Sequence, residues 1–379
     1  FTGHLEESRR AAAILVPLLG DPDVTIFRRS FAWTVVTWFS ASSGEHALGL
    51  QAGEANEAIA RDEGLHVAAR FACVLGWWLA MDRRDIAAGE RYIARFERIM
   101  MADHPYEAAS LANMKAWQGL FTNRTAPMLR HGPEAFRLYD EAGSIPHILG
   151  GLNGLVWACV ELGDDAGAKR WMEAYSHWSI DAAEAILALR RGDEAAAVAK
   201  LHQIFAQDRG RFDGYGHSLS WARTWAAKLA AAALERGIET THATNFIREY
   251  ALDPPAPDIE AWPWPVRIRA LGSLAIEVDG APLVFTGKVP RKPLALLKLL
   301  VAGEPDGVRD TIIMDTLWPD EDGDAARDAY RVALHRLRKL LGRPDAIRSE
   351  DGRVAIDGSV CHVDVFALRS LLDAADLDG

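Results

Sequence analysis

Cysteine is scarce in this sequence of 379 residues, which contains Cys73, Cys159 and Cys361. The three stand far apart and form neither a CxxC pair nor the spacing of a zinc site, so a disulfide framework and a cysteine-based metal centre are excluded. We expect all three to be small buried groups in a protein of the reducing cytoplasm.

Long apolar runs are also missing. The best, residues 294–301, is too short to span a bilayer and is interrupted by Lys298. No secretory signal pattern stands at the start. We therefore expect a cytoplasmic protein with no membrane partner. Because the chain starts at Phe1 and stops just inside a new helical pattern, we expect it to be the C-terminal portion of a larger protein.

Catalytic and cofactor motifs are absent as well. The twelve histidines form no HExxH, and the sequence contains no GxSxG and no GxxxxGK[ST]. The acidic run "DEDGD" at residues 320–324 fails as a calcium loop, since the sixth and twelfth positions hold Ala325 and Arg331 instead of Gly and Glu. The sequence predicts no enzyme, no cofactor and no metal site.

A period of 40 residues runs through the first two thirds of the chain. Trp77, Trp117 and Trp157 are spaced by 40, and polar turn positions follow each by eight residues, at Asp85, Thr125 and Asp165. Each turn opens an Ala-rich helical stretch. Helix pairs at this repeat length bury their apolar faces by stacking on their neighbours, so residues 1–252 are predicted to form an α-solenoid.

The recurring tryptophans allow two interpretations. They could stack on a ligand, or they could form a buried stripe. The residues three positions before and after each Trp are small or apolar, as Val74 and Ala80 are around Trp77. This spacing is that of a helix face turned towards the core, and it favours core packing.

The helical pattern ends in "ALDPPAPDIEAWPWP", where five prolines fall between positions 254 and 265. Proline removes a backbone donor and clashes with the preceding turn, so no helix continues through this segment. Residues 253–265 are therefore predicted to be an extended, stiff linker. Trp262 and Trp264 are expected to pack onto a neighbouring domain, because exposing two indoles to water is unfavourable.

Beyond the linker, "VRIRALG" and "LAIEVDG" alternate with the period of a strand, and three helical patterns follow. They end at Gly303, at Pro319 and at Gly342, and the third is expected to start from a cap at Asp324. "IRSEDGRVAID" then predicts two strands around Asp351–Gly352. Strands, three helices and a terminal hairpin predict a winged helix-turn-helix over residues 266–360.

The third helix has two different faces. Tyr330, Leu334, Leu337 and Leu341 form one apolar stripe, and the opposite face is mostly cationic. A cationic helix on a protein of net charge −11 suits the major groove of DNA, where long side chains reach base edges and flanking ones neutralise phosphates. The candidate DNA contacts are Val332, His335, Arg336 and Lys339 on the outward face, Arg331 and Arg338 on its flanks, and Arg348 and Arg353 on the hairpin.

Two resemblances add to this interpretation. The repeat length and "GDxxxA" turns resemble the tetratricopeptide-like array of MalT-type regulators. The blocks "RKPLALLKLL", "DTLWPDEDGDAARDAYRVALHRLRKLLG" and "DGRVAIDGSVCHVDVFALRSLL" resemble the OmpR-type DNA-binding domain of SARP-type activators. The fold class implied is mainly α, a TPR-like solenoid followed by an α+β winged helix-turn-helix domain.

The resemblance also implies roles. Arg336 falls where the family commonly has a groove-reading arginine, and Val332 falls at an apolar groove contact. Ala333, in place of a more polar residue, and the acidic Asp328 depart from the family's pattern. Residues 361–379 would begin an all-helical bacterial activation domain. The family's N-terminal nucleotide-binding switch has no counterpart motif here.

Two functions follow as hypotheses. The first is a transcription regulator that binds double-stranded promoter DNA, is expected to contact RNA polymerase, and uses its array to bind a small-molecule or protein ligand. The second is a non-enzymatic scaffold whose winged helix contacts proteins. A cationic outward face favours the first, and an apolar or acidic one would favour the second. Self-association and the choice between activation and repression stay open.

Overall fold

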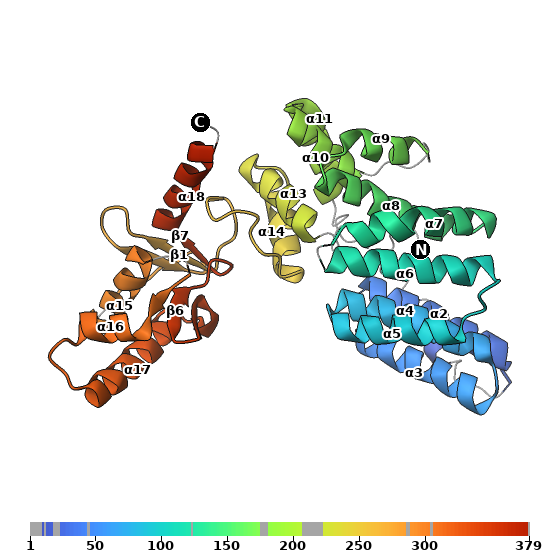
Figure 1. Ribbon diagram of the computed structural model, residues 1–379, viewed down its shortest axis with the longest axis horizontal. Helices are drawn as coiled ribbons and strands as arrows, with labels where there is room; N and C mark the ends of the chain where they lie inside the picture. Colours follow the sequence, from blue (N-terminus) through green and yellow to red (C-terminus); the bar gives the residue numbers. More distant parts are fainter. Residues whose placement is uncertain are drawn as a thin grey trace. The chain divides into compact units, whose positions relative to one another are not determined.

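A computed structural model describes residues 10, 13–17, 23–43, 46–122, 124–174, 181–206, 223–285, 289–303 and 306–377. The chain is mainly helical, with two small sheets near its C-terminus (Figure 1). It divides into two units, one of residues 1–229 and 236–246 and one of residues 230–235 and 247–379. The linker expected at residues 253–265 falls within the second unit.

The described part of the first unit is built of helices, and short turns join the successive helices from α3 to α9. They are α2 (Ile26–Ser43), α3 (His46–Asp62), α4 (His66–Asp82), α5 (Ile86–Ile99), α6 (Pro105–Phe121), α7 (Ala126–Glu141), α8 (Ile145–Glu161), α9 (Asp165–Glu173), α10 (Asp181–Arg191) and α11 (Glu194–Phe205), followed by α13 (Arg223–Glu235) and α14 (Thr240–Glu249) at the division between the units. Sequential neighbours from α2 to α9 pack on each other, and so do α10 and α11. In addition, α2, α4, α6, α8 and α10 contact one another in series. Each helix pair thus buries its face on the next.

The periodic tryptophans occupy α4, α6 and α8, which belong to this series. Trp77, Trp117 and Trp157 are each at most 2% exposed, so the prediction of core packing is confirmed. The rings of Trp117 and Trp157 meet edge to face with centroids 5.4 Å apart, and Trp157 contacts Trp225 at 5.5 Å. Aromatic rings favour this geometry because the positive edge of one faces the negative face of the other.

Two of the three predicted turn positions begin a helix as expected. Asp85 is the N-cap of α5 and accepts a hydrogen bond from the Ala88 amide, whereas Thr125 precedes α7 without a side-chain cap bond. The third position was wrong by one residue, because the cap of α9 is Asp164, which accepts from the Gly167 amide. Gly163, at φ 74°, lies just before it and completes the turn one residue earlier than a strict period of 40 predicts.

Beyond α14, the described residues of the second unit form two sheets and four α-helices. A four-stranded sheet has the order β3-β2-β1-β7 and a three-stranded sheet the order β4-β6-β5. The elements are β1 (Val266–Arg269), β2 (Ala275–Val278), β3 (Ala281–Pro282), α15 (Arg291–Ala302), β4 (Val308–Arg309), α16 (Asp310–Leu317), α17 (Gly323–Leu340), the short 3₁₀ turn η2 (Pro344–Ala346), β5 (Ile347–Glu350), β6 (Arg353–Ile356), β7 (Cys361–Val363) and α18 (Asp364–Leu377).

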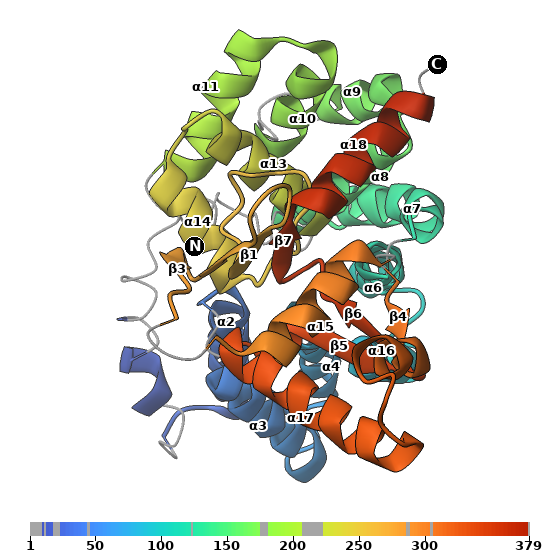
Figure 2. The same ribbon diagram turned by 90° about the vertical axis from the view of Figure 1, so that its left-hand side faces the viewer.

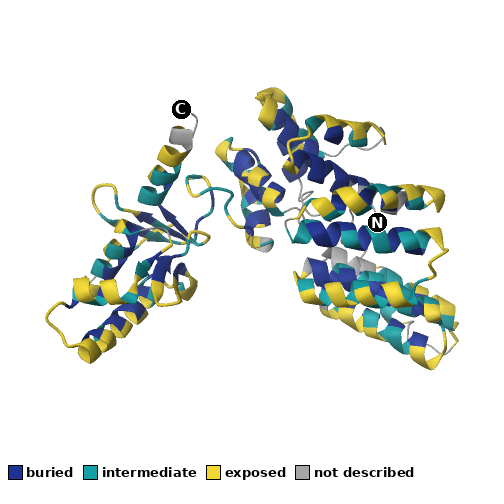
Figure 3. Ribbon diagram, viewed as in Figure 1, coloured by how far each residue is buried: buried dark blue, intermediate teal, exposed yellow. Residues whose placement is uncertain are grey.

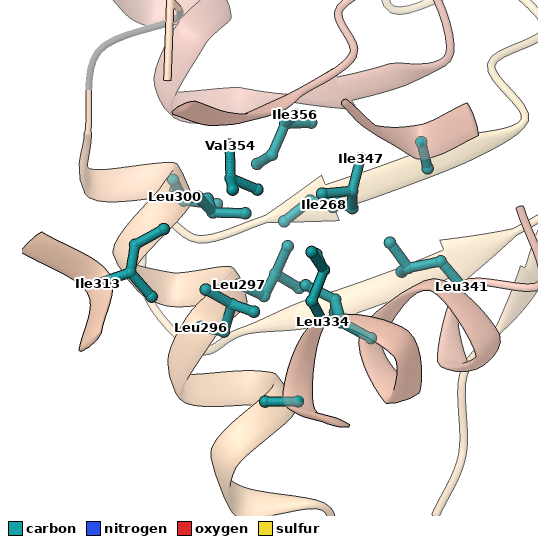
Figure 4. Packing of buried hydrophobic residues seen from close by; sticks show 14 of the residues in the cluster. Ile268, Leu296, Leu297, Leu300, Ile313, Leu334, Leu341, Ile347, Val354 and Ile356 are labelled. Atoms are coloured by element: carbon teal, nitrogen blue, oxygen red, sulfur yellow. The ribbon is translucent and has the colours of Figure 1, made fainter. Parts of the chain in front are cut away.

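One core joins the helices α15, α16 and α17 to both sheets. Fully buried members include Leu296 of α15, Ile313 of α16, Leu337 of α17 and Val354 of β6. Figure 4 shows side chains from these helices meeting those of the strands. The helix ends at Gly303, before Pro319 and at Gly342 are confirmed, and the expected hairpin forms as β5 and β6.

The start of α17 and the end of the second unit differ from expectation. The cap is Asp322, which accepts from the Ala325 amide, so Asp324 lies in the first turn instead, where an acidic group favours the helix dipole. Residues 361–363, expected to begin a separate helical domain, form a strand of the four-stranded sheet. Cys361–Val363 pair in parallel with β1, and Asp364 at the start of α18 accepts hydrogen bonds from the Ala270 and Leu271 amides.

The linker tryptophans are buried, as expected, at 2% exposure for Trp262 and 4% for Trp264. The Trp264 indole donates to the Ile259 carbonyl at 2.8 Å, and its ring packs on His362 of β7 at 5.5 Å. Arg267 of β1 donates to the carbonyls of Glu260 and Trp262. The linker is therefore fastened to the sheet of the second unit.

The three cysteines are unpaired and buried, as expected. Burial raises the pKa of the Cys73 thiol to about 11 and that of Cys361 to about 12, so both stay protonated and unreactive near neutral pH. Within the described residues, no helix combines the length and the apolar character needed to cross a membrane.

Candidate nucleic-acid interface

Helix α17 presents two faces because its apolar residues recur at spacings of three and four. Tyr330, Leu334, Leu337 and Leu341 are all buried, as the stripe predicts. Ala333 is buried too, which places it beside the stripe and away from the surface. The helix is thereby held against the core along most of its length, and its outer side is presented on a fixed backbone.

The outward positions are exposed as the sequence predicts. Val332 is 48% exposed, and His335, Arg336 and Lys339 are exposed one and two turns further on. Figure 3 shows buried and exposed residues alternating along this helix. Among the residues that the structure describes, the side chains of Arg336 and Lys339 have neither a hydrogen bond nor an ion pair. Their charges are therefore available to an external anion.

The two flanking arginines differ from each other. Arg331 is highly exposed and lies 3.7 Å from Asp328 on its own helix, an ion pair that water screens and that contributes little. Arg338 is half-buried and donates to the Ile347 carbonyl from Nη2 at 2.9 Å and from Nε at 3.2 Å. Two of its three guanidinium nitrogens thus bond α17 to β5.

The hairpin arginines also have internal partners. Arg348 Nε lies 3.3 Å from Asp357 Oδ2, and Arg353 Nη1 donates to the Gly307 carbonyl at 2.6 Å. The hairpin tip is acidic, with Glu350 and Asp351 both exposed. The structure therefore leaves α17 as the part of this surface with the most unneutralised positive charge.

Tyr330 joins three elements of this surface. Its hydroxyl interacts with Ser349 of β5 and with Asp310, the first residue of α16. Burial is the largest cause that raises the pKa of Tyr330, and Asp310 adds to it, so the phenol stays neutral. The Asp310 amide in turn donates to the Gly352 carbonyl of the hairpin turn at 2.9 Å. Helix α16 thus contacts both α17 and β4, which pairs with the hairpin strand β6, and Figure 2 shows these elements grouped together.

The sequence analysis did not identify two exposed residues, one directly before α16 and one within it. Arg309 ends β4 and serves as the N-cap of α16, and Ile312 is 49% exposed one turn later. A cation at the position where a helix begins is itself a signal, because Ser, Thr, Asp or Asn is preferred there. Ile312 carried no such signal, since an apolar residue in a short helix is expected to be buried.

No cluster of three or more metal-ligating side chains occurs among the described residues. Comparison of the chain with models of known protein families, with curated proteins and with solved structures found no match, so its interpretation rests on its own residues.

Proposed function

We propose that this protein is a transcription regulator that binds promoter DNA through α17. In this proposal the second unit is a winged helix-turn-helix, in which α16 and α17 form the helix pair and β5 and β6 the wing. The first unit is a TPR-like solenoid that senses or docks a small-molecule or protein ligand. The protein is cytoplasmic, is not an enzyme, needs no cofactor, and acts with RNA polymerase at the promoter.

One observation carries the proposal. The outward face of α17 exposes Arg336 and Lys339 without internal partners, while the opposite face is anchored in the core. The major groove of B-DNA is wide enough to admit one α-helix, and arginine reaches the O6 and N7 atoms of guanine with two hydrogen bonds. A rigid helix with free cations on its outer side suits that use.

The scaffold hypothesis has one observation in its favour. Ile312 and Val332 are each about half exposed on neighbouring helices, and exposed apolar side chains are common in protein-protein contacts. In a DNA complex the same groups would contact thymine methyl groups or sugars. The two functions therefore differ in how binding depends on salt.

The test is a titration of the full chain with duplex DNA, followed by fluorescence anisotropy at several salt concentrations. Log affinity should fall linearly with log salt, by about 0.9 for each phosphate neutralised. Lys339→Ala should make that slope shallower by about 0.9, the contribution of one neutralised phosphate. Absence of duplex binding at low salt would overturn the DNA-binding proposal and favour the scaffold.

A further inference from the structure

Arg309 stands in an electrostatically unfavourable place. It lies directly opposite Arg353 in the antiparallel pair of β4 and β6, so both side chains leave the same face of the sheet. Like charges directly opposite each other destabilise a sheet. Both residues are exposed, and Arg309 has no ion pair or side-chain hydrogen bond among the described residues.

Among the described residues, no carboxylate forms an ion pair with Arg309. Glu350 faces Arg353 from β5, the strand beyond β6. Glu350 is thus two strands away from Arg309, roughly 9–10 Å at the usual strand spacing. Such a distance is about one Debye length at physiological salt, so attraction between exposed groups is largely screened. The positive end of the α16 dipole adds to the repulsion that Arg309 experiences.

The neighbouring guanidinium is fixed. Arg353 donates from Nη1 to the carbonyl of Gly307, the residue directly before β4, which holds the guanidinium beside the start of that strand. Asp310, directly after Arg309, is bonded through its amide to Gly352 and interacts with Tyr330 of α17. The two arginines are therefore positioned beside the helix that carries the proposed DNA contacts.

We propose that Arg309 and Arg353 together bind a backbone phosphate of the duplex that α17 enters. This inference rests on the proposed function and adds a second backbone anchor, on β4 and β6, to the contacts made from α17. A phosphate diester has two charged oxygens, and a pair of guanidinium groups on one sheet face can donate to both. Binding would remove the repulsion that exists in the free protein.

The test uses the full chain, duplex DNA and three variants. Arg309→Ser should lower the log-log salt slope by about 0.9, so that between 50 and 200 mM salt its affinity falls ~3.5-fold less than that of the wild type. The loss at low salt should be the same for all DNA sequences, since phosphate carries no base information. Arg309→Lys keeps the charge and should keep the slope.

Arg269→Ser is the matched control. It removes one arginine that is already paired with Glu277, on the other sheet of the same unit, and should leave the slope unchanged. A second readout is amide exchange over α16 in the free chain. Serine is a favourable N-cap and ends the repulsion, so Arg309→Ser should increase protection about fivefold. Weaker DNA binding together with a more stable helix distinguishes a ligand contact from a structural role.

The outcomes separate the two proposals. If the wild type binds DNA but Arg309→Ser leaves affinity and slope unchanged, the phosphate anchor is wrong and the DNA-binding proposal stands. If the wild type shows no salt-dependent duplex binding, the proposed function fails and the anchor fails with it. A decrease in α16 protection in Arg309→Ser would make Arg309 structural and overturn the anchor.

Discussion

The two units use a periodic side chain in opposite ways. In the first unit tryptophan recurs every 40 residues, and each copy is buried among its neighbours. In the second unit cations recur along the outer side of α17 and stay in water. Both patterns indicate which residues lie on the same face of a helix. Whether that face is buried depends on the free energy of removing it from water, which is favourable for an indole and unfavourable for an unpaired guanidinium.

The charge pattern of the second unit is local. Residues 253–379 contain 16 basic and 22 acidic side chains, yet residues 329–340 contain four basic and no acidic ones. If the proposed function is right, attraction to DNA cannot come from the net charge of this region, which is negative. We expect it to come from α17 and its immediate neighbours, to be short-ranged and to be strongly weakened by salt.

The largest effect is expected for the core of the first unit. Trp117→Ala removes a buried indole and leaves a cavity against Trp157 and Gly154, which should lower the free energy of unfolding by about 3–5 kcal/mol. Trp171→Ala is the control, since this ring is half-buried and packs on Phe136 at 5.8 Å. Denaturant unfolding measures both. Equal small losses would show that the periodic tryptophans do not hold the array together.

Next in size is the loss of base discrimination in Arg336→Ala. A guanidinium that reads guanine with two hydrogen bonds contributes about 1–3 kcal/mol, and only at the base it reads. Competition titrations between a selected site and random duplex should show this loss with unchanged stability, because Arg336 has no described internal partner. Arg331→Ala, on the flank, should weaken both duplexes alike. A uniform loss in Arg336→Ala would place that residue on phosphate instead.

Arg338 shows why the sequence predicts the face of a helix better than the role of each residue on it. The 3.6-residue period correctly placed this residue on the flank of α17, and the sequence analysis assigned it to phosphate. The structure shows two of its three donor nitrogens, Nε and Nη2, on the Ile347 carbonyl. That carbonyl belongs to β5, and no local pattern states which backbone oxygen a long side chain will meet. Arg338→Ala should therefore destabilise the junction of α17 and β5 and weaken DNA binding indirectly.

Strand pairing was missed for a related reason. The alternation in residues 266–278 predicted β1 and β2, and Asp351–Gly352 predicted the hairpin, because both signals are local. The pair of β7 with β1 joins residues 95 positions apart, and three residues, Cys361–Val363, are too few for a periodic signal. The same segment was assigned to a separate domain by resemblance. Which strand pairs at the edge of a sheet is determined by contacts between segments far apart in the sequence. Local sequence patterns carry no information on those contacts.

A smaller effect is expected on stability, which should depend on pH in the core of the second unit through His362. His362 is buried in β7 against Trp264, and its Nε2 has no hydrogen-bond partner in the part of the chain that the structure describes. Burial, with Arg267 beside it, lowers the pKa of His362, while Glu260 and Asp364 oppose the shift. The folded state thus disfavours the proton. The contribution of neutral His362 to the free energy of unfolding is fully present above the unfolded pKa of about 6.5. It is lost as the pH falls from there towards the lower folded pKa.

This pH dependence should appear in the second unit and disappear in His362→Phe, which keeps an aromatic ring on Trp264. Amide exchange of residues 259–268 and 360–364 as a function of pH measures it in the full chain. The buried residues of α10 in the first unit are alanine, isoleucine and leucine, which do not titrate, so α10 provides an internal control. A wild-type profile that is flat between pH 7 and pH 5 in the second unit would contradict the assignment to His362.

The smallest expected effect is a gain in stability at a turn of the array. Three turns share one hydrogen-bond pattern, in which the residue before the Asp cap donates to a carbonyl three positions back, and Asp85, Asp164 and Asp193 each donate to one five positions back. The residue before the cap has a positive φ in all three, 74° at Gly163 and 68° at Gly192. The third is Arg84, at φ 60°.

A side chain in this left-handed conformation is strained, whereas glycine is not. Arg84→Gly should therefore raise the free energy of unfolding, by about 0.5–1 kcal/mol once the greater freedom of glycine in the unfolded chain is subtracted. Arg91→Gly, the same exchange in the middle of α5, should lower it by about 1 kcal/mol. The opposite signs matter more than the sizes, because they separate the backbone conformation of the repeat turn from any effect of losing an arginine. If both variants lose stability alike, Arg84 contributes through its side chain, and the repeat turn is not the reason for its conformation.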